Sequence, residues 1–404
     1  MTDDNKRENG KHCIVFHYSE IGLKGGNRKT FEDQLMRNIQ QSLSGVLKRH
    51  ITRRYGRFIM DLPETFDWQA ISERLKKVVG LANFVLAETL DQNFEAILES
   101  AVRQMKEIPY DSFAVVTRRV QKTFPMRSMD ISKEIGAAIL AERDVRVDLS
   151  NPDVSCYVDI FDDRAVVYCE KIPGLRGLPV GTGERAVSLL SSGIDSPVAS
   201  WKIITRGVKL TFVHFHSAPF TSLASLNNTK RLVKHLTEYQ YNSKLYAVPF
   251  LDYQQAIMMN AKPEYRVVLY RRGMYRIAEL VAKKVKANAL VTGESIGQVA
   301  SQTLSNMRMI SEVTSLPVLR PISGHDKEEI IQVARKINTF DISTEPYEDC
   351  CSLFVPKHPV TRSIPDIVYE AEEKIDLEGL LRSALDKAEV SRFKFPGDEQ
   401  EQSP

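Results

Sequence analysis

A short turn rich in serine and glycine is the first part of the chain that could carry chemistry. The segment SLLSSGIDSPVAS (188–200) has the pattern of an apolar strand, then Ser-Ser-Gly, then a helix that opens on Asp195, Ser196 and Pro197. Small residues let a phosphate approach the backbone, free N–H groups point at it, and the helix dipole favours its charge. The turn therefore indicates an anion site. The alternative is an ordinary helix cap formed by the same serine and aspartate side chains.

A pair of adjacent cysteines, Cys350 and Cys351, is the second candidate. The pair lies in STEPYEDCCSLFVPKHPVT (343–361), whose prolines and lack of periodicity predict an exposed loop. An exposed thiol can act as a nucleophile, but its acidic neighbours disfavour the thiolate whereas Lys357 and His358 favour it, so its reactivity stays open. The alternative is two buried small residues. The remaining cysteines lie in apolar strands and are predicted to be core residues: Cys13, Cys156 and Cys169.

The elements that must position these residues fall into two halves. In the first half, short strands alternate with amphipathic helices and end in a hairpin, which predicts an α+β arrangement. The expected elements are a strand at 13–18, a helix from 30 to about 47, strands within 51–62, helices at 67–80 and 94–106, a strand at 112–120, a helix at 130–143 and a hairpin at 156–170. The segment KIPGLRGLPVGTGE (171–184) is rich in glycine and proline and is interpreted as a linker.

In the second half, β-branched apolar runs alternate with helices. The expected strands are 186–191, 209–217, 244–250, 289–295 and 317–323, and the last precedes a helix at 326–338. This alternation predicts a parallel sheet with helices on both faces, and ligands bind such sheets beyond the carboxyl ends of the strands. The C-terminus is expected to be helical over 364–390 and then to fray into a polar tail.

Two further segments of this half carry candidate residues. The run VTGESIGQVASQT (291–303) is expected to leave its strand through Gly293 into a helix that bears Gln298 and Gln302. The alternative is a strand end with a glycine cap and a polar surface. The helix at 264–285 has four arginines, of which some are expected to face solvent: Arg266, Arg271, Arg272 and Arg276. Arg271 follows a mostly apolar turn and could point at a phosphate.

Composition excludes several classes of protein. With 404 residues, of which 43% are hydrophobic, the chain can form two or three packed domains. The net charge of +3, from 55 basic and 52 acidic residues, shows no overall bias towards polyanions. Five cysteines without a CxxC pair indicate neither a zinc site nor a secreted disulfide framework, so no metal-ligand cluster is expected. The polar N-terminus and the lack of an apolar run of ~18 residues predict a soluble, cytoplasmic protein with no membrane association.

Several segments resemble a known family. Residues 191–196, SSGIDS, are similar to SGGxDS, the pyrophosphate-binding loop of PP-loop ATP pyrophosphatases, except that Ser192 stands where the motif usually has its first glycine. Over residues 13–395 the chain resembles the tRNA 4-thiouridine synthetases. The segments that carry this likeness are EIGLKGGNR (20–28), KTFP (122–125), SSGIDSPVAS (191–200), TGESIGQVASQT (292–303) and EDCC (348–351).

The resemblance implies an α+β N-terminal half followed by an α/β half. It assigns 1–65 to a ferredoxin-like domain, 66–171 to a THUMP RNA-binding domain and 172–404 to a PP-loop domain with a doubly wound parallel sheet. It also implies that ATP is bound with Gly293 behind the nucleotide and Gln302 in contact with it. The implied ATP-binding residues are Leu189, Leu190, Ser191, Ser192, Gly193, Asp195, Ser196, His214, Phe215, Arg271, Gly293 and Gln302.

Two basic runs in the first half agree with an RNA-binding role. KRHITRRYGRF (48–58) and TRRVQKTFPMR (117–127) combine cations that neutralise phosphates with aromatic rings that stack on unpaired bases. A charge run alone is more typical of a solvated surface, but two runs in the half that is implied to bind RNA favour contact. This half is implied to grip the tRNA acceptor end. The predicted contacts, which position the RNA rather than read its sequence, are Arg118, Arg119, Lys122, Lys24 and Arg28.

The implied reaction is ATP-dependent tRNA sulfurtransfer. ATP adenylates O4 of the uridine at the eighth position of tRNA, pyrophosphate leaves, and Mg²⁺ helps to hold the phosphates, with Asp195 orienting the metal or its waters. A persulfide on Cys351 then attacks C4 and AMP departs, leaving 4-thiouridine. Cys350 is the alternative carrier, or resolves the disulfide. No third cysteine lies near the pair, so no iron–sulfur cluster is expected.

The resemblance also implies partners. The chain ends soon after the PP-loop domain, so the C-terminal rhodanese domain of some relatives is expected to be missing. A separate cysteine desulfurase would then load the sulfur. Sulfur transfer to the sulfur-carrier protein of thiamine thiazole synthesis, and a homodimer, are also implied.

Two other functions stay open at the level of sequence. An amidotransferase-type synthetase would keep the PP-loop but use ammonia, or another nucleophile, on its adenylated RNA or other acceptor. It would need no exposed cysteine pair. A non-catalytic RNA-binding protein with a relic nucleotide fold is the other, and the Ser192 departure is its only support.

Overall fold

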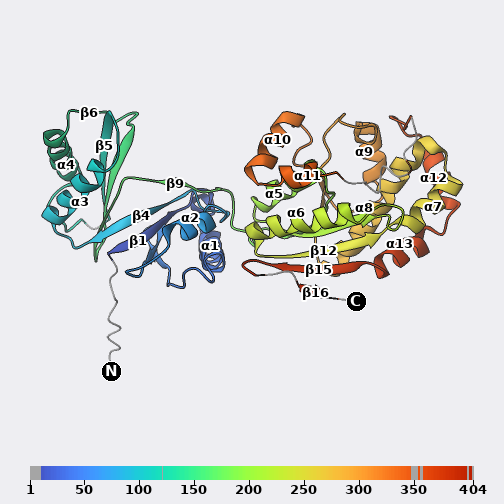
Figure 1. Ribbon diagram of the computed structural model, residues 1–404, viewed down its shortest axis with the longest axis horizontal. Coiled ribbons are helices and arrows are strands. Elements are labelled where there is room, and N and C mark those ends of the chain that lie inside the picture. Colours follow the sequence, from blue (N-terminus) through green and yellow to red (C-terminus); the bar gives the residue numbers. More distant parts are fainter. Residues whose placement is uncertain (1–10, 121, 347–353, 355–357, 398–399, 403–404) are drawn as a thin grey trace, which may run out of the picture. The chain divides into compact units, whose positions relative to one another are not determined.

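The chain forms two compact units, Met1–Gly177 and Leu178–Pro404 (Figure 1). The computed structural model describes residues 11–120, 122–346, 354, 358–397 and 400–402. The boundary between the units along the chain lies inside the glycine- and proline-rich segment at 171–184, whose sequence has no helical or strand periodicity. Each unit has its own sheet and its own apolar core.

The first unit is a nine-stranded sheet in the order β2-β3-β1-β4-β8-β7-β5-β6, with β9 paired to β4. Its strands are β1 (His12–His17), β2 (Thr52–Arg54), β3 (Arg57–Asp61), β4 (Asn83–Leu90), β5 (Ser112–Arg119), β6 (Arg146–Val147), β7 (Val154–Ile160), β8 (Ala165–Tyr168) and β9 (Ile172–Pro173). Its helices are η1 (Glu20–Leu23), η2 (Gly25–Asn27), α1 (Arg28–Ser42), α2 (Trp68–Leu75), α3 (Phe94–Lys106) and α4 (Ser128–Glu142). Pairing is antiparallel except where β5 joins β6 and β7.

Helical periodicity explains why these helices dock on the sheet. In α3, the buried residues Ile97, Ala101 and Met105 recur every four positions and pack with α4 and β7 into one core. Asn93 caps α3 by accepting a hydrogen bond from the amide of Ala96. A second core lies between α1, α2 and the opposite end of the sheet. The two cores correspond to two helix-covered parts of one sheet.

The sheet curls so that its two parts face each other. Strand β3 is separated from β7 by three strands, which in a flat sheet would place them about 19 Å apart. Nevertheless the guanidinium of Arg57 on β3 donates to the buried carboxylate of Asp159 on β7, which also accepts from the hydroxyl of Tyr168 at 3.2 Å. Arg54 adds ion pairs to Asp162 and Asp163 at 3.1 and 3.0 Å. A third apolar core, from both parts, fills the concave face. The expected domain boundary at residue 65 stays a prediction, since β4 pairs with strands of both parts.

The second unit is a seven-stranded sheet in the order β14-β13-β10-β11-β12-β15-β16. Its strands are β10 (Arg185–Leu189), β11 (Lys209–His216), β12 (Asn242–Pro249), β13 (Ala289–Val291), β14 (Val318–Leu319), β15 (Glu389–Lys394) and β16 (Gln400–Gln402). The first five are parallel, as the sequence predicts. The chain runs outward from β10 to β12 and then returns to β13 on the other side of β10. The strand order therefore reverses at β10 and β13, the place where such folds bind ligands.

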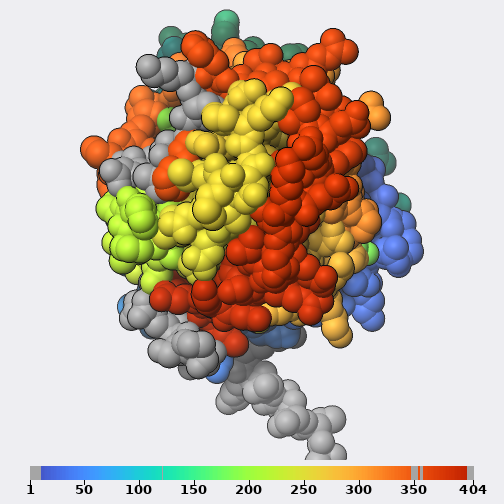
Figure 2. Space-filling model, turned by 90° about the vertical axis from the view of Figure 1, so that its right-hand side faces the viewer, coloured from blue at the N-terminus to red at the C-terminus, as the bar shows by residue number. Residues whose placement is uncertain are grey.

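Helices cover both faces of this sheet. They are α5 (Asp195–Ile204), α6 (Ala224–Gln240), α7 (Leu251–Asn260), α8 (Arg266–Val285), α9 (Leu304–Ser311), α10 (Lys327–Lys336), α11 (Phe340–Thr344), α12 (Pro365–Glu373) and α13 (Leu377–Asp386), with short 3₁₀ turns η3 (Pro263–Tyr265) and η4 (Ala300–Gln302). The main core joins α7, α8, α12 and α13 to the sheet, and a smaller one joins α5 and α10. Figure 2 shows the C-terminal helices (red) beside α7 (yellow), as their contacts require. Within the described residues, no helix has the length and apolarity to cross a membrane.

The expectation of a frayed tail after residue 390 is wrong. Residues 389–394 form β15, which pairs antiparallel with β12, and β16 extends the edge (Figure 1). In β15, Ser391 and Phe393 are buried while Arg392 and Lys394 are exposed, an alternation of period two. The alternation is short and rich in charge, so the helical pattern before it obscured the strand in the sequence.

The buried ion pair of the first unit yields a stability prediction. Arg57→Met leaves the Asp159 carboxylate buried without its cation, so we expect the free energy of unfolding to fall by about 3–5 kcal/mol. Urea titration of the full chain, followed by far-UV circular dichroism, measures it. An exposed ion pair on α13, between Arg382 and Glu378, supplies the control. Arg382→Met breaks this i,i+4 contact and should change the free energy of unfolding by less than about 0.5 kcal/mol. Equal losses in the two variants would contradict a special role for Arg57.

Candidate functional site

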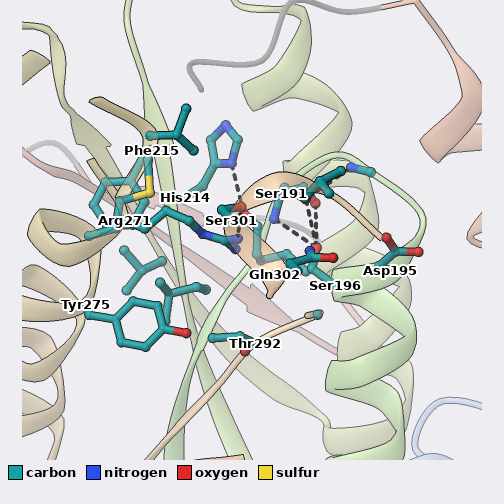
Figure 3. Close-up of a pocket in the computed structure, with 18 of the residues that line it drawn as sticks. Ser191, Asp195, Ser196, His214, Phe215, Arg271, Tyr275, Thr292, Ser301 and Gln302 are labelled. Atoms are coloured by element: carbon teal, nitrogen blue, oxygen red, sulfur yellow. Dashed lines mark hydrogen bonds between the residues drawn. The ribbon is translucent and has the colours of Figure 1, made fainter. Parts of the chain in front are cut away.

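A cavity of about 430 Å³ opens beyond the carboxyl ends of β10, β11 and β13 (Figure 3). Its lining residues come from the carboxyl ends of these strands and the turns that follow them, from α8, from the segment around η4 and from Pro359. They are Leu189, Leu190, Ser191, Gly193, Asp195, Ser196, Val213, His214, Phe215, Val267, Arg271, Met274, Tyr275, Thr292, Gly293, Val299, Ala300, Ser301, Gln302 and Pro359. The cavity thus lies at the reversal of strand order.

The serine-rich turn is closed by its own hydroxyl groups. The amide of Ser191 donates to Oγ of Ser196 at 2.9 Å, and that hydroxyl donates back to the Ser191 carbonyl at 3.1 Å. The amide of Gly193 donates to Oγ of Ser191 at 3.3 Å, and the hydroxyl of Ser343 donates to the Gly193 carbonyl at 3.3 Å. These bonds hold the turn rigidly beside the cavity before any ligand arrives.

The interpretation of this turn as an ordinary side-chain cap is wrong. The N-cap residue of α5 is Ile194, and among the described residues no side chain caps that helix end. The carboxylate of Asp195 instead accepts from the ammonium of Lys327 at 2.7 Å and from the amide of Gln298 at 2.9 Å. The first amides of α5, those of Asp195 and Ser196, therefore have no side-chain cap, and such a helix N-terminus can bind an anion.

Gly293 lets the end of β13 touch the start of α5. A Cβ at this position would lie 2.6 Å from the Ser196 amide nitrogen and 2.7 Å from the Ser196 Cα, both closer than real contacts allow. Both atoms belong to backbone, which cannot rotate away. Only glycine permits this approach, so the wall behind the cavity and the serine-rich turn form one rigid unit.

Ser192, the departure from the SGGxDS pattern, turns its side chain away from the cavity. Its hydroxyl is buried 3.1 Å from that of Ser225 at the start of α6, and Ser225 lies 3.3 Å from Nε2 of His214. Nδ1 of His214 lies 2.9 Å from the Leu190 carbonyl, which can only accept, so Nδ1 carries a proton. In a neutral ring, Nε2 then accepts from Ser225, and Ser225 accepts from Ser192. The backbone of Ser192 does not have a positive φ, so it does not require glycine.

The four arginines of α8 have separate roles. Arg272 and Arg276 both bind the carboxylate of Glu372, and Arg272 is buried. Arg266 donates to the Met258 carbonyl at 3.2 Å. Only Arg271 lines the cavity, where its Nη1 donates to Oγ of Ser301 at 3.0 Å (Figure 3).

The expected helix at Gln298 and Gln302 is wrong. After β13 the chain forms an irregular loop, the short η4 turn at Ala300–Gln302, and then α9. The side-chain amide of Asn306 holds this loop by donating to the Ala300 carbonyl at 2.8 Å. Gly297 has a positive φ, which interrupts a helix, and Thr303 is the N-cap of α9, so the regular helix begins only after Gln302.

The structure brings most of the predicted ATP-binding residues together. Eleven of the twelve line the cavity, and Ser192 is the one that points away. Their contact with a nucleotide stays a prediction. Sequence reasoning missed Lys327 and Glu294. Lys327 lies at the start of a regular helix, 132 positions from Asp195, and no local pattern marks it. Glu294 directly follows Gly293, and its acidic side chain in an apolar strand end was the available signal.

The cysteine pair lies outside the described residues, so Cys350 and Cys351 stay predictions. On the C-terminal side of the pair, Pro359 lines the cavity, and the Val360 carbonyl accepts a hydrogen bond from the side-chain amide of Asn306 at 2.8 Å. The core assignment of the other cysteines is confirmed for two of them: Cys13 and Cys156 are buried, while Cys169 is half-buried. Burial raises the pKa of the Cys13 thiol to about 12, so it is inert at neutral pH.

Asp195 is the acidic residue of the cavity lining that suits a magnesium ion. The described part of the chain holds no group of three metal-ligating side chains. Mg²⁺ in nucleotide sites commonly uses one or two carboxylates together with substrate phosphates and waters. The single carboxylate of Asp195 beside the serine-rich turn fits that donor set.

The predicted RNA-binding residues lie in the first unit, in two places. Arg118 and Lys122 are exposed, whereas Arg119 points to the other side of β5 and donates to the carbonyls of Phe124 and Met126 at 2.9 and 2.7 Å. Arg119 therefore shapes the loop after β5. Lys24 lies over the ring of Phe31, and Arg28 binds Glu32 and Tyr18. Within the run at 48–58, three arginines are paired with carboxylates: Arg57 is buried, Arg54 is half-buried and Arg53 is exposed.

Comparison with known proteins finds three family models along the chain, in the order that the resemblance implies. Residues 181–377 match the family described as thiamine biosynthesis protein (ThiI), 13–85 match the ThiI ferredoxin-like domain and 88–170 match the THUMP domain. The predicted fold class is thus confirmed: ferredoxin-like and THUMP parts precede a PP-loop domain with a parallel sheet, whose edge strands β15 and β16 are antiparallel.

Individual proteins match over nearly their whole length. The chain is 43% identical to a probable tRNA sulfurtransferase of Moorella thermoacetica, covering 93% of this chain and 96% of that protein. It is 42% identical to another of Brevibacillus brevis, covering 94% and 96%. A 4-thiouridine synthetase solved in complex with RNA and with bound ATP has a TM-score of 0.88 and 37% identity, and covers 95% of this chain and 100% of that chain. PH1313 of Pyrococcus horikoshii, at 23% identity and a TM-score of 0.61, shares the fold over 81% of this chain and 99% of its own.

The close approach at Gly293 yields a prediction for ligand binding. Gly293→Ala pushes β13 away from the first turn of α5, so we expect ATP binding to weaken about tenfold or more and the free energy of unfolding to fall by about 1–3 kcal/mol. Isothermal titration calorimetry with ATP, and urea titration, measure the two effects. Gly324→Ala is the matched control, because a Cβ there meets no atom within 4 Å. Unchanged ATP affinity in Gly293→Ala would contradict the prediction.

The hydroxyl of Ser192 yields a prediction for stability. Ser192→Ala removes one buried hydrogen bond, so the free energy of unfolding should fall by about 0.5–1.5 kcal/mol. Ser305→Ala, at an exposed position of α9, should have no measurable effect in the same urea titration. Equal behaviour of the two variants would show that the bond to Ser225 contributes nothing.

Proposed function

The chain belongs to the ThiI family of tRNA sulfurtransferases, and from that premise we propose that it is an ATP-dependent tRNA uracil 4-sulfurtransferase, which forms 4-thiouridine at the eighth position of tRNA. The observation that carries the proposal is the convergence of eleven predicted nucleotide contacts on one cavity. The 37% identical 4-thiouridine synthetase with bound ATP supports ATP as the ligand of this cavity.

In the proposed first step, O4 of the uracil attacks the α-phosphorus of ATP. The O4–P bond forms, the bond between the α- and β-phosphates breaks, and pyrophosphate leaves. The first amides of α5 hold the phosphates, and Arg271 and Lys327 supply positive charge. Lys327 is paired to Asp195 in the structure, so a phosphate or a cation at Asp195 would compete for the same groups. Mg²⁺, when bound near Asp195, would neutralise phosphate charge and align the leaving group.

In the proposed second step, the terminal sulfur of a persulfide on Cys351 attacks C4 and AMP departs with the oxygen. The thiolate of Cys350 then attacks Sγ of Cys351, which leaves the transferred sulfur on C4 and joins the two cysteines in a disulfide. A thiol reductant must reduce this disulfide before the next turnover. Adenylation is needed because an unactivated oxygen on C4 is a poor leaving group.

The partners follow from the same proposal. We propose a tRNA acceptor end as the ligand of the first unit, in which the exposed Arg118 and Lys122 offer phosphate contacts. The RNA bound to the similar 4-thiouridine synthetase supports this assignment. A cysteine desulfurase as sulfur donor, the thiamine sulfur-carrier protein as a second acceptor, a homodimer and a cytoplasmic location are the remaining proposals. They rest on family membership.

A relic nucleotide fold without catalysis loses its only support. That reading depended on Ser192, whose side chain points towards α6 and leaves the cavity unobstructed.

The reaction can be tested directly. Unmodified tRNA is incubated with the full chain, ATP, Mg²⁺, dithiothreitol, and a cysteine desulfurase with cysteine, and nucleosides are quantified by mass spectrometry. We expect a 4-thiouridine peak that falls to background in Cys351→Ala, because its thiol carries the sulfur. Cys350→Ala is expected to give at most one turnover, because the resolving thiol is missing. Cys169→Ala, a half-buried cysteine of the first unit, should leave the yield unchanged.

Two results would count against the proposal. Full yield with Cys351→Ala would favour another nucleophile, such as ammonia. A lack of 4-thiouridine together with release of pyrophosphate that depends on tRNA would retain adenylation but reject sulfur transfer.

A further inference from the structure

A buried carboxylate, Glu294, lies directly behind the wall of the cavity. It follows Gly293 at the end of β13 and is 0% exposed. Its Oε2 accepts from Nε of Arg320 at 2.6 Å, from the hydroxyl of Tyr275 at 2.8 Å and from that of Thr292 at 3.0 Å. One carboxylate oxygen is therefore saturated by three neighbours, which fix the position of the side chain.

The other carboxylate oxygen faces the cavity arginine. Oε1 accepts no hydrogen bond from the described residues and lies 3.4 Å from Nη2 of Arg271. Burial alone would raise the pKa of Glu294, but the charges of Arg271 and Arg320 outweigh burial, and the pKa lies below its ordinary value. The side chain thus stays a carboxylate at neutral pH and attracts Arg271 by charge.

Arg271 is consequently held at two points. Its Nη2 faces Glu294, and its Nη1 donates to Oγ of Ser301 on the opposite wall at 3.0 Å. An arginine side chain without such contacts loses considerable rotamer entropy when it binds an anion, and fixing it beforehand removes part of that cost. Figure 3 shows the guanidinium extended from α8 towards Ser301 across the cavity.

We propose that Glu294 is a positioning residue: it fixes the guanidinium of Arg271 in the orientation that contacts the bound nucleotide. The inference rests on the proposed function in one respect, namely that the cavity binds ATP. Glu294 does not touch the nucleotide, because it lies behind Gly293 and outside the cavity lining. Its other oxygen, Oε2, binds Tyr275 and Thr292, which also line the cavity, so the effect through Arg271 must be separated from theirs by comparison in an Arg271 variant.

The same chain contains a matched carboxylate without this role. Glu372 is also buried, at 8% exposure, and also binds two arginines of α8, Arg272 and Arg276. Neither arginine lines the cavity. A Glu→Gln change at either position therefore removes a buried charge beside the same helix, but only the change at Glu294 affects a cavity residue.

The test compares ATP binding and kinetics of the full chain for Glu294→Gln and Glu372→Gln. Calorimetry with ATP gives Kd, tRNA-dependent pyrophosphate release gives KM and kcat, and thermal melting gives stability. We expect Glu294→Gln to raise Kd and KM for ATP about tenfold or more, since it removes a charge-assisted contact to Arg271. The change in kcat should be smaller. Glu372→Gln should lower the melting temperature while Kd stays within about twofold of the wild type.

Dependence on Arg271 separates positioning from a general loss of structure. In an Arg271→Met background, adding Glu294→Gln should change Kd by less than about threefold, because the residue through which it acts is gone. Should Glu294→Gln fail to fold, Ser301→Ala removes the other fixed contact without disturbing the buried charges. It should raise Kd by about threefold, and only where Arg271 is present.

The outcomes distinguish the two levels of the argument. A wild-type chain that binds no ATP rejects the proposed function itself. Two results would overturn the positioning role alone, given a wild-type chain that binds ATP. In the first, Glu294→Gln weakens ATP binding no more than Glu372→Gln does. In the second, Glu294→Gln weakens ATP binding equally with and without Arg271. If Glu294→Gln does not fold and Ser301→Ala is used instead, an ATP affinity of Ser301→Ala equal to that of the wild type also overturns the positioning role.

Discussion

The contact between the backbone at Gly293 and the first turn of α5 is the constraint on which the candidate site depends. It joins two segments that are nearly a hundred residues apart and come from the two strands at which the order of the sheet reverses. A side chain of any size at Gly293 would separate them. Because the contact involves backbone on both sides, the serine-rich turn, the start of α5 and the back wall of the cavity keep one relative geometry.

Charges are then arranged around this rigid contact. Behind it lies the buried carboxylate Glu294, held by Arg320, Tyr275 and Thr292, and in front of it lies Arg271. At the mouth of the turn, Asp195 pairs with Lys327 from α10. Each of these pairs is drawn from separate elements, so the cavity is preorganised by the packing of the whole unit rather than by one loop.

The first unit uses buried charge differently. There the pair of Arg57 and Asp159 links strands that a flat sheet would hold far apart, and an apolar core fills the curve between them. Two arginines of the basic run at 48–58, Arg54 and Arg57, are engaged in this internal role rather than in an RNA surface. Arg118 and Lys122, on and after β5, are among the exposed cations that remain suited to a polyanion.

The sequence by itself determined the features that depend on neighbouring residues: the serine-rich turn with its helix, the alternation that gives five parallel strands, and the small residue at Gly293. It also determined the family, because motifs such as TGESIGQVASQT are local strings. Local patterns misled at β15, where a short alternation follows a helix, and at η4, where polar residues mimic one. The partners of side chains were decided only by tertiary structure. Arg271 lines a cavity while Arg272 is buried with Glu372, Ser192 faces α6, and Lys327 pairs with Asp195. Each of these contacts joins segments that are far apart in the chain. The spacing of residues along the sequence does not encode which distant segments lie close together in space.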